Sequence, residues 1–307
     1  MWDSLDPRSL DTRDREPPDP RDPGSLDPRD VFARGLDLPR GLERERVHVH
    51  EHDYELRGSE VRTLATVGAF RVVPLDDLRD ERGRSQDLWH GDLDHLRTAG
   101  LIRTVAPLDR GHDRDRTTLV SLTERGRALL ESHRARDFEP RQAFYAGLVK
   151  PRELAHDAQL YRAYLRAAER LRADDARIHR VVLDYELKRE YQRFLQERNR
   201  DRYDSDGRPT RTREEVQDWA YTHDLPIVDE RVQFPDVRLE YERPDGRRDA
   251  EDIEVTTPHY RGAHAAAKAR SGFTRFRAAG SRVGGRMVRG GGGGRSPDPH
   301  LAEEFLE

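Results

Sequence analysis

The run Asp94-His-Leu-Arg-Thr-Ala-Gly-Leu-Ile-Arg103 joins the end of a predicted helix to the start of a predicted strand. Leu96 belongs to an apolar helix face, and Gly100 suits the left-handed position that closes a helix. A second run, Leu122-Thr-Glu-Arg-Gly-Arg-Ala-Leu-Leu130, reverses this order, because an apolar strand leads into a helix that begins near Thr123. The two runs predict a helix, two strands and a closing helix.

The segments on either side of these runs complete a small domain. Two helices are expected upstream, from Ser59 and from Pro74, and a third begins at Ser85. Two strands follow the third helix and flank a charged tip at residues 109–116. Three helices, a hairpin and a closing helix predict a winged helix-turn-helix over residues 57–136. The third helix is expected to turn four apolar side chains inward: Leu88, Trp89, Leu93 and Leu96.

These two runs and the charged tip between them resemble the winged-helix regulators of the MarR and PadR type. The resemblance implies that the third helix enters the major groove of duplex DNA and that the wing contacts phosphates. Acidic side chains on the same helix (Asp87, Asp92 and Asp94) repel phosphate, so a protein-binding role for this domain stays open. The resemblance assigns base reading to Ser85, Gln86 and His90, and backbone contact to Arg110, Arg114 and Arg116.

A second folded unit is expected over residues 145–277, after a linker around residues 134–142. Helices before and after a pair of strands predict an α/β domain with a small mixed sheet, so the fold class of the chain is α+β. The expected helices cover residues 151–172, 187–198, 212–222 and 261–277, and the expected strands cover residues 178–185, 233–242 and 252–257.

Two carboxylates on the strands of this second unit are the chemical candidates. Asp236 stands at the start of one strand, and Glu254 lies in the next strand, beyond a turn at residues 244–246. Carboxylates brought together on neighbouring strands can hold Mg²⁺ or Mn²⁺ through oxygen ligands. Such an ion polarises a phosphodiester and activates water.

Asp236, Glu254 and the basic helix after them resemble the PD-(D/E)XK nuclease fold. Together with the winged helix, they resemble more closely the replication-relaxation family of mobile elements, over most of residues 57–277. The resemblance implies a catalytic lysine two residues after the acid, where this chain has Thr256. Lys268 on the following helix is the candidate replacement. Without a lysine at position 256 we expect a degenerate nuclease-like domain, and enzymatic activity stays open.

The loop after Glu254 offers further groups to an anionic ligand, next to the start of a helix. The candidates for phosphate contact are Thr256, His259, Tyr260 and Arg261. A plain helix-entry loop, in which threonine and proline only set the turn, explains these residues equally well.

The composition of the two ends of the chain predicts that they lie outside the folded units. Of the 307 residues, 38% are charged and 34% are hydrophobic, a balance that leaves part of the chain outside any packed core. Residues 1–46 are rich in proline and acids and are expected to form a disordered arm, and residues 278–307 are expected to form a flexible glycine- and arginine-rich tail. The absence of cysteine excludes disulfides and thiolate metal sites.

These patterns predict a cytoplasmic DNA-binding protein of a mobile element or plasmid, with no membrane segment. Its nuclease-like domain would bind nucleic acid or a replication or mobilisation protein. The alternatives are an active Mg²⁺-dependent DNA endonuclease and a transcriptional regulator whose second domain mediates protein contacts. The helix at 151–172 could also join two copies into a homodimer.

Overall fold

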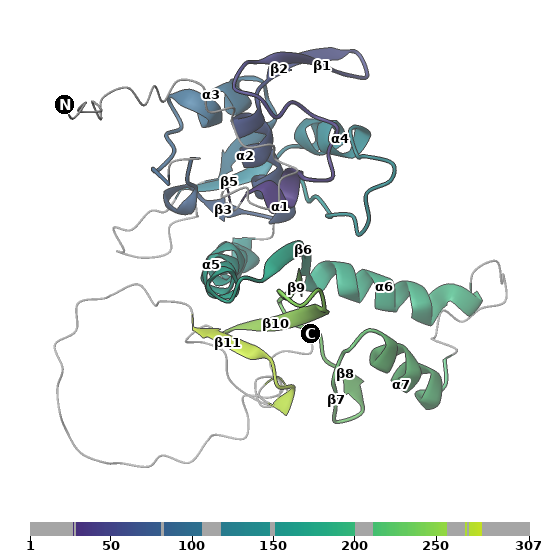
Figure 1. Cartoon of the computed structure of the whole chain (residues 1–307). Coiled ribbons are helices and arrows are strands. Elements are labelled where there is room, and N and C mark those ends of the chain that lie inside the picture. Colours follow the sequence, from purple (N-terminus) through teal and green to yellow (C-terminus); the bar gives the residue numbers. More distant parts are fainter. Residues whose placement is uncertain are drawn as a thin grey trace, which may run out of the picture.

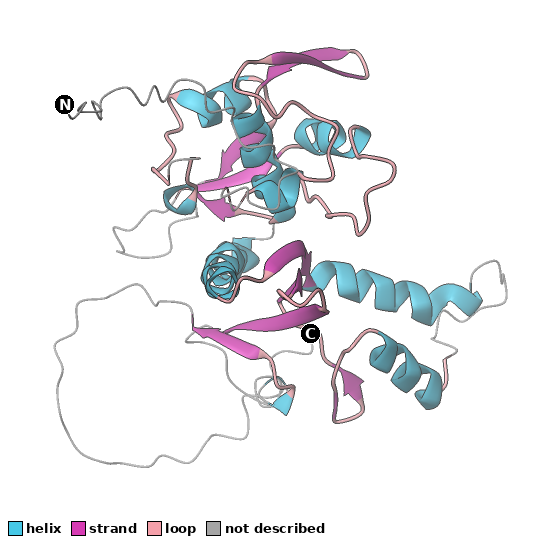
Figure 2. Ribbon diagram, viewed as in Figure 1, coloured by secondary structure: helices cyan, strands magenta, loops and turns pink. Residues whose placement is uncertain are grey.

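The computed structural model describes residues 27, 29–80, 83–105, 118–147, 151–199, 211–256, 268 and 270–277. These residues form a mixed α+β architecture in which helices pack beside small sheets, as the sequence predicts (Figures 1 and 2). We call residues 29–147 the first unit and residues 151–277 the second unit. None of the helices within the described ranges is both long enough and apolar enough to cross a bilayer.

The first unit is built around a small antiparallel sheet with strand order β3-β5-β4. The first unit also contains a separate antiparallel hairpin, β1-β2. In chain order the unit contains α1 (Asp30–Ala33), β1 (Glu45–Val49), β2 (His52–Leu56), α2 (Gly58–Ala69), β3 (Val73–Pro74), the 3-10 helix η2 (Leu75–Asp77), α3 (Gly91–Thr98), β4 (Ile102–Val105), β5 (Leu119–Leu122) and α4 (Glu124–Ser132).

The expected disordered arm over residues 1–46 is wrong for its last part. Residues 29–46 include α1 and the first two residues of β1, and Arg29 donates to Thr63 on α2 over 3.1 Å. Four apolar side chains in this segment supply the core contacts that its charged composition conceals, which explains why it folds. They are Val31, Phe32, Leu36 and Leu38, each less than 9% exposed.

Two of the four expected helices of the first unit differ from the prediction. The second is only the short helix η2, and the third begins at Gly91 rather than at Ser85. The Asp87 carboxylate accepts the backbone N–H of Trp89 over 2.8 Å, which offers this segment an alternative to helical hydrogen bonds. Trp89 is therefore 70% exposed instead of inward, while Leu93 and Leu96 are fully buried as expected.

The second unit is built on a four-stranded mixed sheet with strand order β11-β10-β9-β6. β9 pairs antiparallel with both β6 and β10, and β11 runs parallel to β10. The unit contains α5 (Pro151–Ala173), β6 (Arg177–Leu183), α6 (Asp184–Gln196), the 3-10 helix η3 (Glu197–Asn199), α7 (Arg213–Thr222), β7 (Ile227–Val228), β8 (Arg231–Val232), β9 (Val237–Glu242), β10 (Arg248–Thr256) and β11 (Thr274–Arg277).

The end of the expected helix over residues 261–277 is wrong, because residues 274–277 form strand β11. Gly272 takes a φ of 80°, a left-handed conformation that interrupts a helix. Phe276 then pairs with Val255 of β10 and packs into the core. The sheet therefore gains a fourth strand at its edge.

Helix α5 joins the two units through one continuous core. In Figure 1 it is seen nearly end-on, between the first unit above and the sheet of the second unit below. Tyr161 and Tyr164 pack their rings 5.1 and 5.5 Å from the ring of Phe70 in the first unit. The same core includes Leu239 and Val255 of the sheet. Most of the apolar residues of α5 therefore belong to the core of this chain.

Candidate functional site

The pairing of β9 with β10 brings the two predicted carboxylates to one end of the sheet. Val237 lies opposite Ile253, and Asp236 directly precedes this pair. The backbone N–H of Asp236 donates to the Ile253 carbonyl over 3.0 Å. One carboxylate oxygen of Asp236 accepts the backbone N–H of Val255 over 2.8 Å. Asp236 is thereby fixed beside the strand that carries Glu254.

Lys268 lies against both carboxylates. Its Nζ is 2.5 Å from Oε2 of Glu254 and 4.0 Å from Oδ1 of Asp236, and it donates to the Phe234 carbonyl over 2.6 Å. The two carboxylate oxygens that face this ammonium can therefore be no further apart than the sum of the first two distances. The expected convergence of Asp236, Glu254 and Lys268 is present in the structure.

All three charged side chains are buried. Glu254 is 2% exposed, and Asp236 and Lys268 are each 9% exposed. A charge is buried without a large desolvation cost only where an opposite charge and hydrogen bonds compensate for it. Lys268 supplies that compensation to Glu254 and, at longer range, to Asp236.

A histidine from α5 completes the surroundings of Asp236. His156 Nε2 lies 3.3 Å from Oδ2 of Asp236, and its Nδ1 lies 3.4 Å from Oδ1 of Asp157. Burial alone would lower the pKa of His156, but its two carboxylate partners outweigh that effect and raise the pKa to about 10. Burial alone would likewise raise the pKa of Asp236, but His156, Lys268 and the Val255 N–H hold that pKa below its usual value. His156 is thus a second cation at this site.

Sequence reasoning missed His156. It lies four residues before Leu160 and eight before Tyr164, two buried residues of α5, so it falls on the buried stripe of that helix. A titratable side chain on such a stripe was the available signal.

The site is connected to the first unit by further ion pairs. Arg71, which follows α2, lies 3.2 Å from Asp157 and 3.2 Å from Glu153 on α5. Asp157 is in turn the neighbour of His156. A line of charged contacts therefore runs from Arg71 through Asp157 and His156 to Asp236.

The donor set fits a hard divalent cation in chemical type, because Asp236 and Glu254 offer carboxylate oxygens. Their charges are, however, matched by Lys268 and His156, and the ammonium lies directly on Glu254. Across the parts of the chain that the structure describes, no three metal-ligating side chains form a group that could hold an ion. Mg²⁺ or Mn²⁺ would have to bind Asp236 and Glu254 in competition with these cations.

Of the expected phosphate contacts after Glu254, Thr256 lies within the described residues, and it does not join this cluster. The hydroxyl of Thr256 donates to the carbonyl of Phe276 over 3.2 Å and so ties β10 to β11. His259, Tyr260 and Arg261 lie outside the described residues.

The expected base-reading residues precede α3 instead of lying on it. Ser85 accepts a hydrogen bond from Arg79 over 3.0 Å. The Gln86 amide donates to Thr63 and to the Arg79 carbonyl over 3.1 and 2.9 Å, so its side chain is used within the chain. His90 is exposed beside α3. The expected backbone contacts Arg110, Arg114 and Arg116 lie outside the described residues.

Two of the acids near α3 are compensated within the first unit. Arg57 lies 2.6 Å from Asp92, whose side chain is 9% exposed, and Arg97 lies 2.7 Å from Asp94. These pairs weaken the repulsion of phosphate expected from Asp92 and Asp94, and the effect is smaller at Asp94, whose side chain is 37% exposed.

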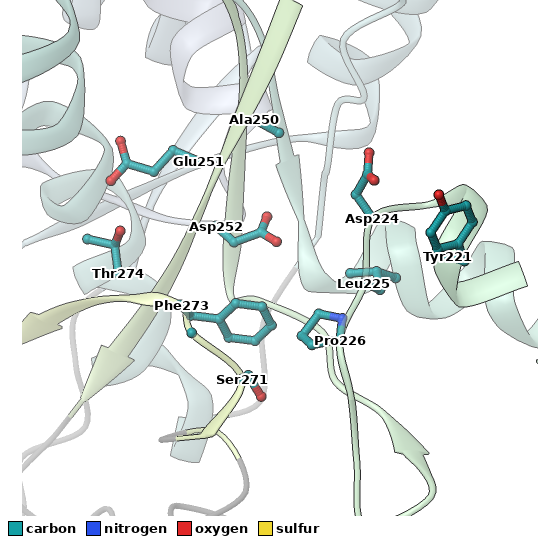
Figure 3. Close-up of a pocket in the computed structure, with 11 residues that line it drawn as sticks. Tyr221, Asp224, Leu225, Pro226, Ala250, Glu251, Asp252, Ser271, Phe273 and Thr274 are labelled. Atoms are coloured by element: carbon teal, nitrogen blue, oxygen red, sulfur yellow. The ribbon is translucent and has the colours of Figure 1, made fainter. Parts of the chain in front are cut away.

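A pocket of about 490 Å³ opens in the second unit, between the end of α7, β10 and the start of β11 (Figure 3). Asp252 and Glu251 line it, but Arg238 lies 2.7 Å from Asp252, and Arg170 pairs with Glu251. Phe273 lines the pocket and also lies 5.7 Å from Nζ of Lys268. The three residues of the candidate site are not among its lining residues.

Comparison of the chain with protein-family models, with curated proteins and with solved structures finds no match.

Proposed function

We propose that this chain is a DNA-binding protein of a mobile element or plasmid, in which a winged helix-turn-helix contacts duplex DNA and a nuclease-like domain engages nucleic acid or a replication partner. The observation that carries the proposal is the meeting of Asp236, Glu254 and Lys268 at one end of the β9-β10 pair. Two acids and one lysine at a sheet end are the side chains that phosphodiester chemistry uses.

The order of elements in the second unit supports a nuclease-like domain of the PD-(D/E)XK kind. Helix α5 precedes β6, β9 and β10, and β11 closes the sheet beside β10 with the sheet order following the chain order. Lys268 lies between β10 and β11, where a side chain can return to the acids. Membership of the replication-relaxation family is part of the same proposal.

The order of elements in the first unit supports a winged helix-turn-helix. Helices α2 and α3 are separated by β3, β4 and β5 form a hairpin, and α4 closes the unit. In this arrangement α3 and the loop before it face the major groove.

Binding of the full chain to duplex DNA over a salt series tests the proposal. If the chain contacts three phosphates, raising the salt from about 50 to about 200 mM should weaken the affinity roughly 40-fold, because binding releases the counterions of each neutralised phosphate. An affinity independent of salt would contradict phosphate-dominated binding.

A second candidate function is an active Mg²⁺- or Mn²⁺-dependent endonuclease, and Lys268 favours it. With its ammonium between the two acids, Lys268 can supply the positive charge that Thr256 cannot. Asp236 and Glu254 would hold the ion, which would activate water for attack on phosphorus.

Incubation of supercoiled plasmid with the full chain and either metal tests this candidate. Nicking that is lost in Asp236→Asn and in Glu254→Gln, and retained in the exposed control Asp229→Asn, would support it. Nicking that persists in both site variants would arise from a contaminant, and the absence of nicking would leave the degenerate form of the domain as the better description.

A further inference from the structure

An exposed aromatic side chain lies beside the candidate site, where the first and second units meet. Tyr185 stands at the start of α6 and is 54% exposed. The guanidinium of Arg71 lies 5.8 Å from the centre of its ring. The ring of Tyr145 meets it edge-on at 6.2 Å and 85°. We call Tyr185 and Arg71 the stacking platform.

Two routes through the structure place this platform next to Asp236. The backbone N–H of Asp184, the residue before Tyr185, donates to the carbonyl of Asp236 over 3.2 Å. On the other side, Arg71 contacts Asp157, which neighbours His156, and His156 contacts Asp236. A group stacked on Tyr185 would therefore lie a short distance from the acids of the site.

The platform is held in place from several sides. Glu153 and Asp157 each lie 3.2 Å from Arg71 and fix its guanidinium. The hydroxyl of Tyr145 donates to Glu186 over 3.3 Å, and its backbone N–H donates to Gly68 over 2.7 Å. A ring whose neighbours are fixed loses little conformational entropy when a ligand stacks on it.

The charge at the platform selects the kind of ligand. Because Glu153 and Asp157 balance Arg71, the platform attracts a phosphate or a carboxylate only weakly. An aromatic face backed by a guanidinium fits a flat, uncharged, polarisable ring. Nucleobases that are not paired within a duplex present such a ring, and every base has one.

We propose that Tyr185 and Arg71 stack an unpaired nucleobase beside Asp236, so that the chain binds DNA where duplex meets single strand. This inference rests on the proposed DNA-binding function. The first unit would hold the duplex, and a strand leaving it would cross the junction near α5 with one base on Tyr185. The next phosphodiester of that strand would then approach Asp236, Glu254 and Lys268.

Fluorescence anisotropy with the full chain tests this inference, using one labelled hairpin duplex with an unpaired 3′ overhang and the same hairpin with a blunt end. Wild type is expected to bind the overhang form more tightly. Tyr185→Ala should weaken binding of the overhang form about 5- to 100-fold and leave blunt binding unchanged. Tyr185→Phe keeps the ring and should behave as wild type.

Tyr221→Ala is the matched control, since Tyr221 is 86% exposed on α7 and should not affect either affinity. Equal affinity of wild type for the two hairpins overturns the inference. So does a Tyr185→Ala variant that loses the same affinity for both hairpins. A Tyr185→Phe variant that loses as much affinity as Tyr185→Ala also overturns it. Blunt binding that persists in any of these cases leaves the proposed function standing. A wild-type chain that binds neither hairpin overturns both.

Discussion

The ammonium of Lys268 lies 2.5 Å from the carboxylate of Glu254, although the two residues belong to different elements of the second unit. Glu254 points from β10, and Lys268 reaches it from the segment between β10 and β11. The positive charge that the sequence lacks at position 256 is therefore supplied from further along the chain. This pair is both the centre of the candidate site and a buried structural contact.

Removal of Lys268 should destabilise the fold strongly. Lys268→Met removes the cation that lies 2.5 Å from Glu254, which is 2% exposed, and breaking a buried ion pair by removing one partner typically costs about 3–5 kcal/mol. Urea unfolding monitored by circular dichroism measures the loss. The double variant Glu254→Leu/Lys268→Met removes both charges and should recover much of the stability, because apolar side chains then replace the buried ion pair and Asp236 keeps His156 as its cation.

Arg270→Ala provides the comparison for Lys268→Met. Arg270 pairs with Asp229 near Lys268 in the sequence, but both side chains are more than half exposed. An exposed ion pair contributes only about 0–1 kcal/mol. If Lys268→Met proved as mild as Arg270→Ala, the buried pair with Glu254 would not be present in solution.

The stability of the chain should depend on the protonation of His156 at alkaline pH. The folded chain raises the pKa of His156 from 6.5 to about 10, so the folded state binds this proton more tightly than the unfolded state. The resulting stabilisation is complete below pH 6.5 and is lost as the pH rises toward 10. The lowered pKa of Asp236 has the opposite sign, since its stabilisation is present above the unfolded value of 3.8 and is lost in acid.

Urea midpoints of wild type and of His156→Gln, measured from pH 6.5 to about pH 10, check this prediction. The alkaline decline should be shallower in His156→Gln, because that variant has no proton to lose at position 156. Since the His156 side chain is 36% exposed, we expect a modest difference. His90→Gln, at an 85% exposed side chain, serves as control. Identical pH curves for wild type and His156→Gln would contradict the contact with Asp236.

A change in the core between the units should loosen both of them together. Phe70 is fully buried against Phe32, Tyr161 and Tyr164, and its truncation to alanine typically costs about 3–5 kcal/mol. Hydrogen exchange should show a similar loss of protection in α2 of the first unit and in β9 of the second unit. Loss of protection in α2 alone would mean that the units unfold independently.

Local sequence patterns were sufficient for most elements of the fold. Leu93 and Leu96 correctly located α3, and Gly100, with a φ of 70°, follows it as predicted. The predicted start of α3 at Ser85 was wrong because the Asp87 carboxylate accepts the backbone N–H of Trp89, an interaction that hydrophobic periodicity does not reveal. Strand β11 was not predicted, because its pairing with β10 joins residues that lie far apart in the sequence.

The candidate site shows the same limit. Spacing along two expected strands was enough to bring Asp236 and Glu254 together, since neighbouring strands place their side chains in register. His156 comes from a helix that lies far away in the sequence, and tertiary packing, including that of Tyr161 on Phe70, sets the position of that helix. Tertiary contacts of this kind leave no short-range pattern to read.

The acids near α3 offer a last test, because their environments differ. Asp92 is paired with Arg57 and its side chain is 9% exposed, so Asp92→Asn should cost about 1–3 kcal/mol of stability. Asp94 is 37% exposed, so Asp94→Asn should change stability by no more than about 1 kcal/mol.

If α3 faces DNA, removal of the Asp94 charge should raise affinity for duplex about 2- to 5-fold at low salt, because a unit charge near a phosphate is worth up to about 1 kcal/mol in water. The gain should shrink as salt screens it. An unchanged affinity at low salt would place the DNA away from α3 and would favour a protein-binding role for the first unit.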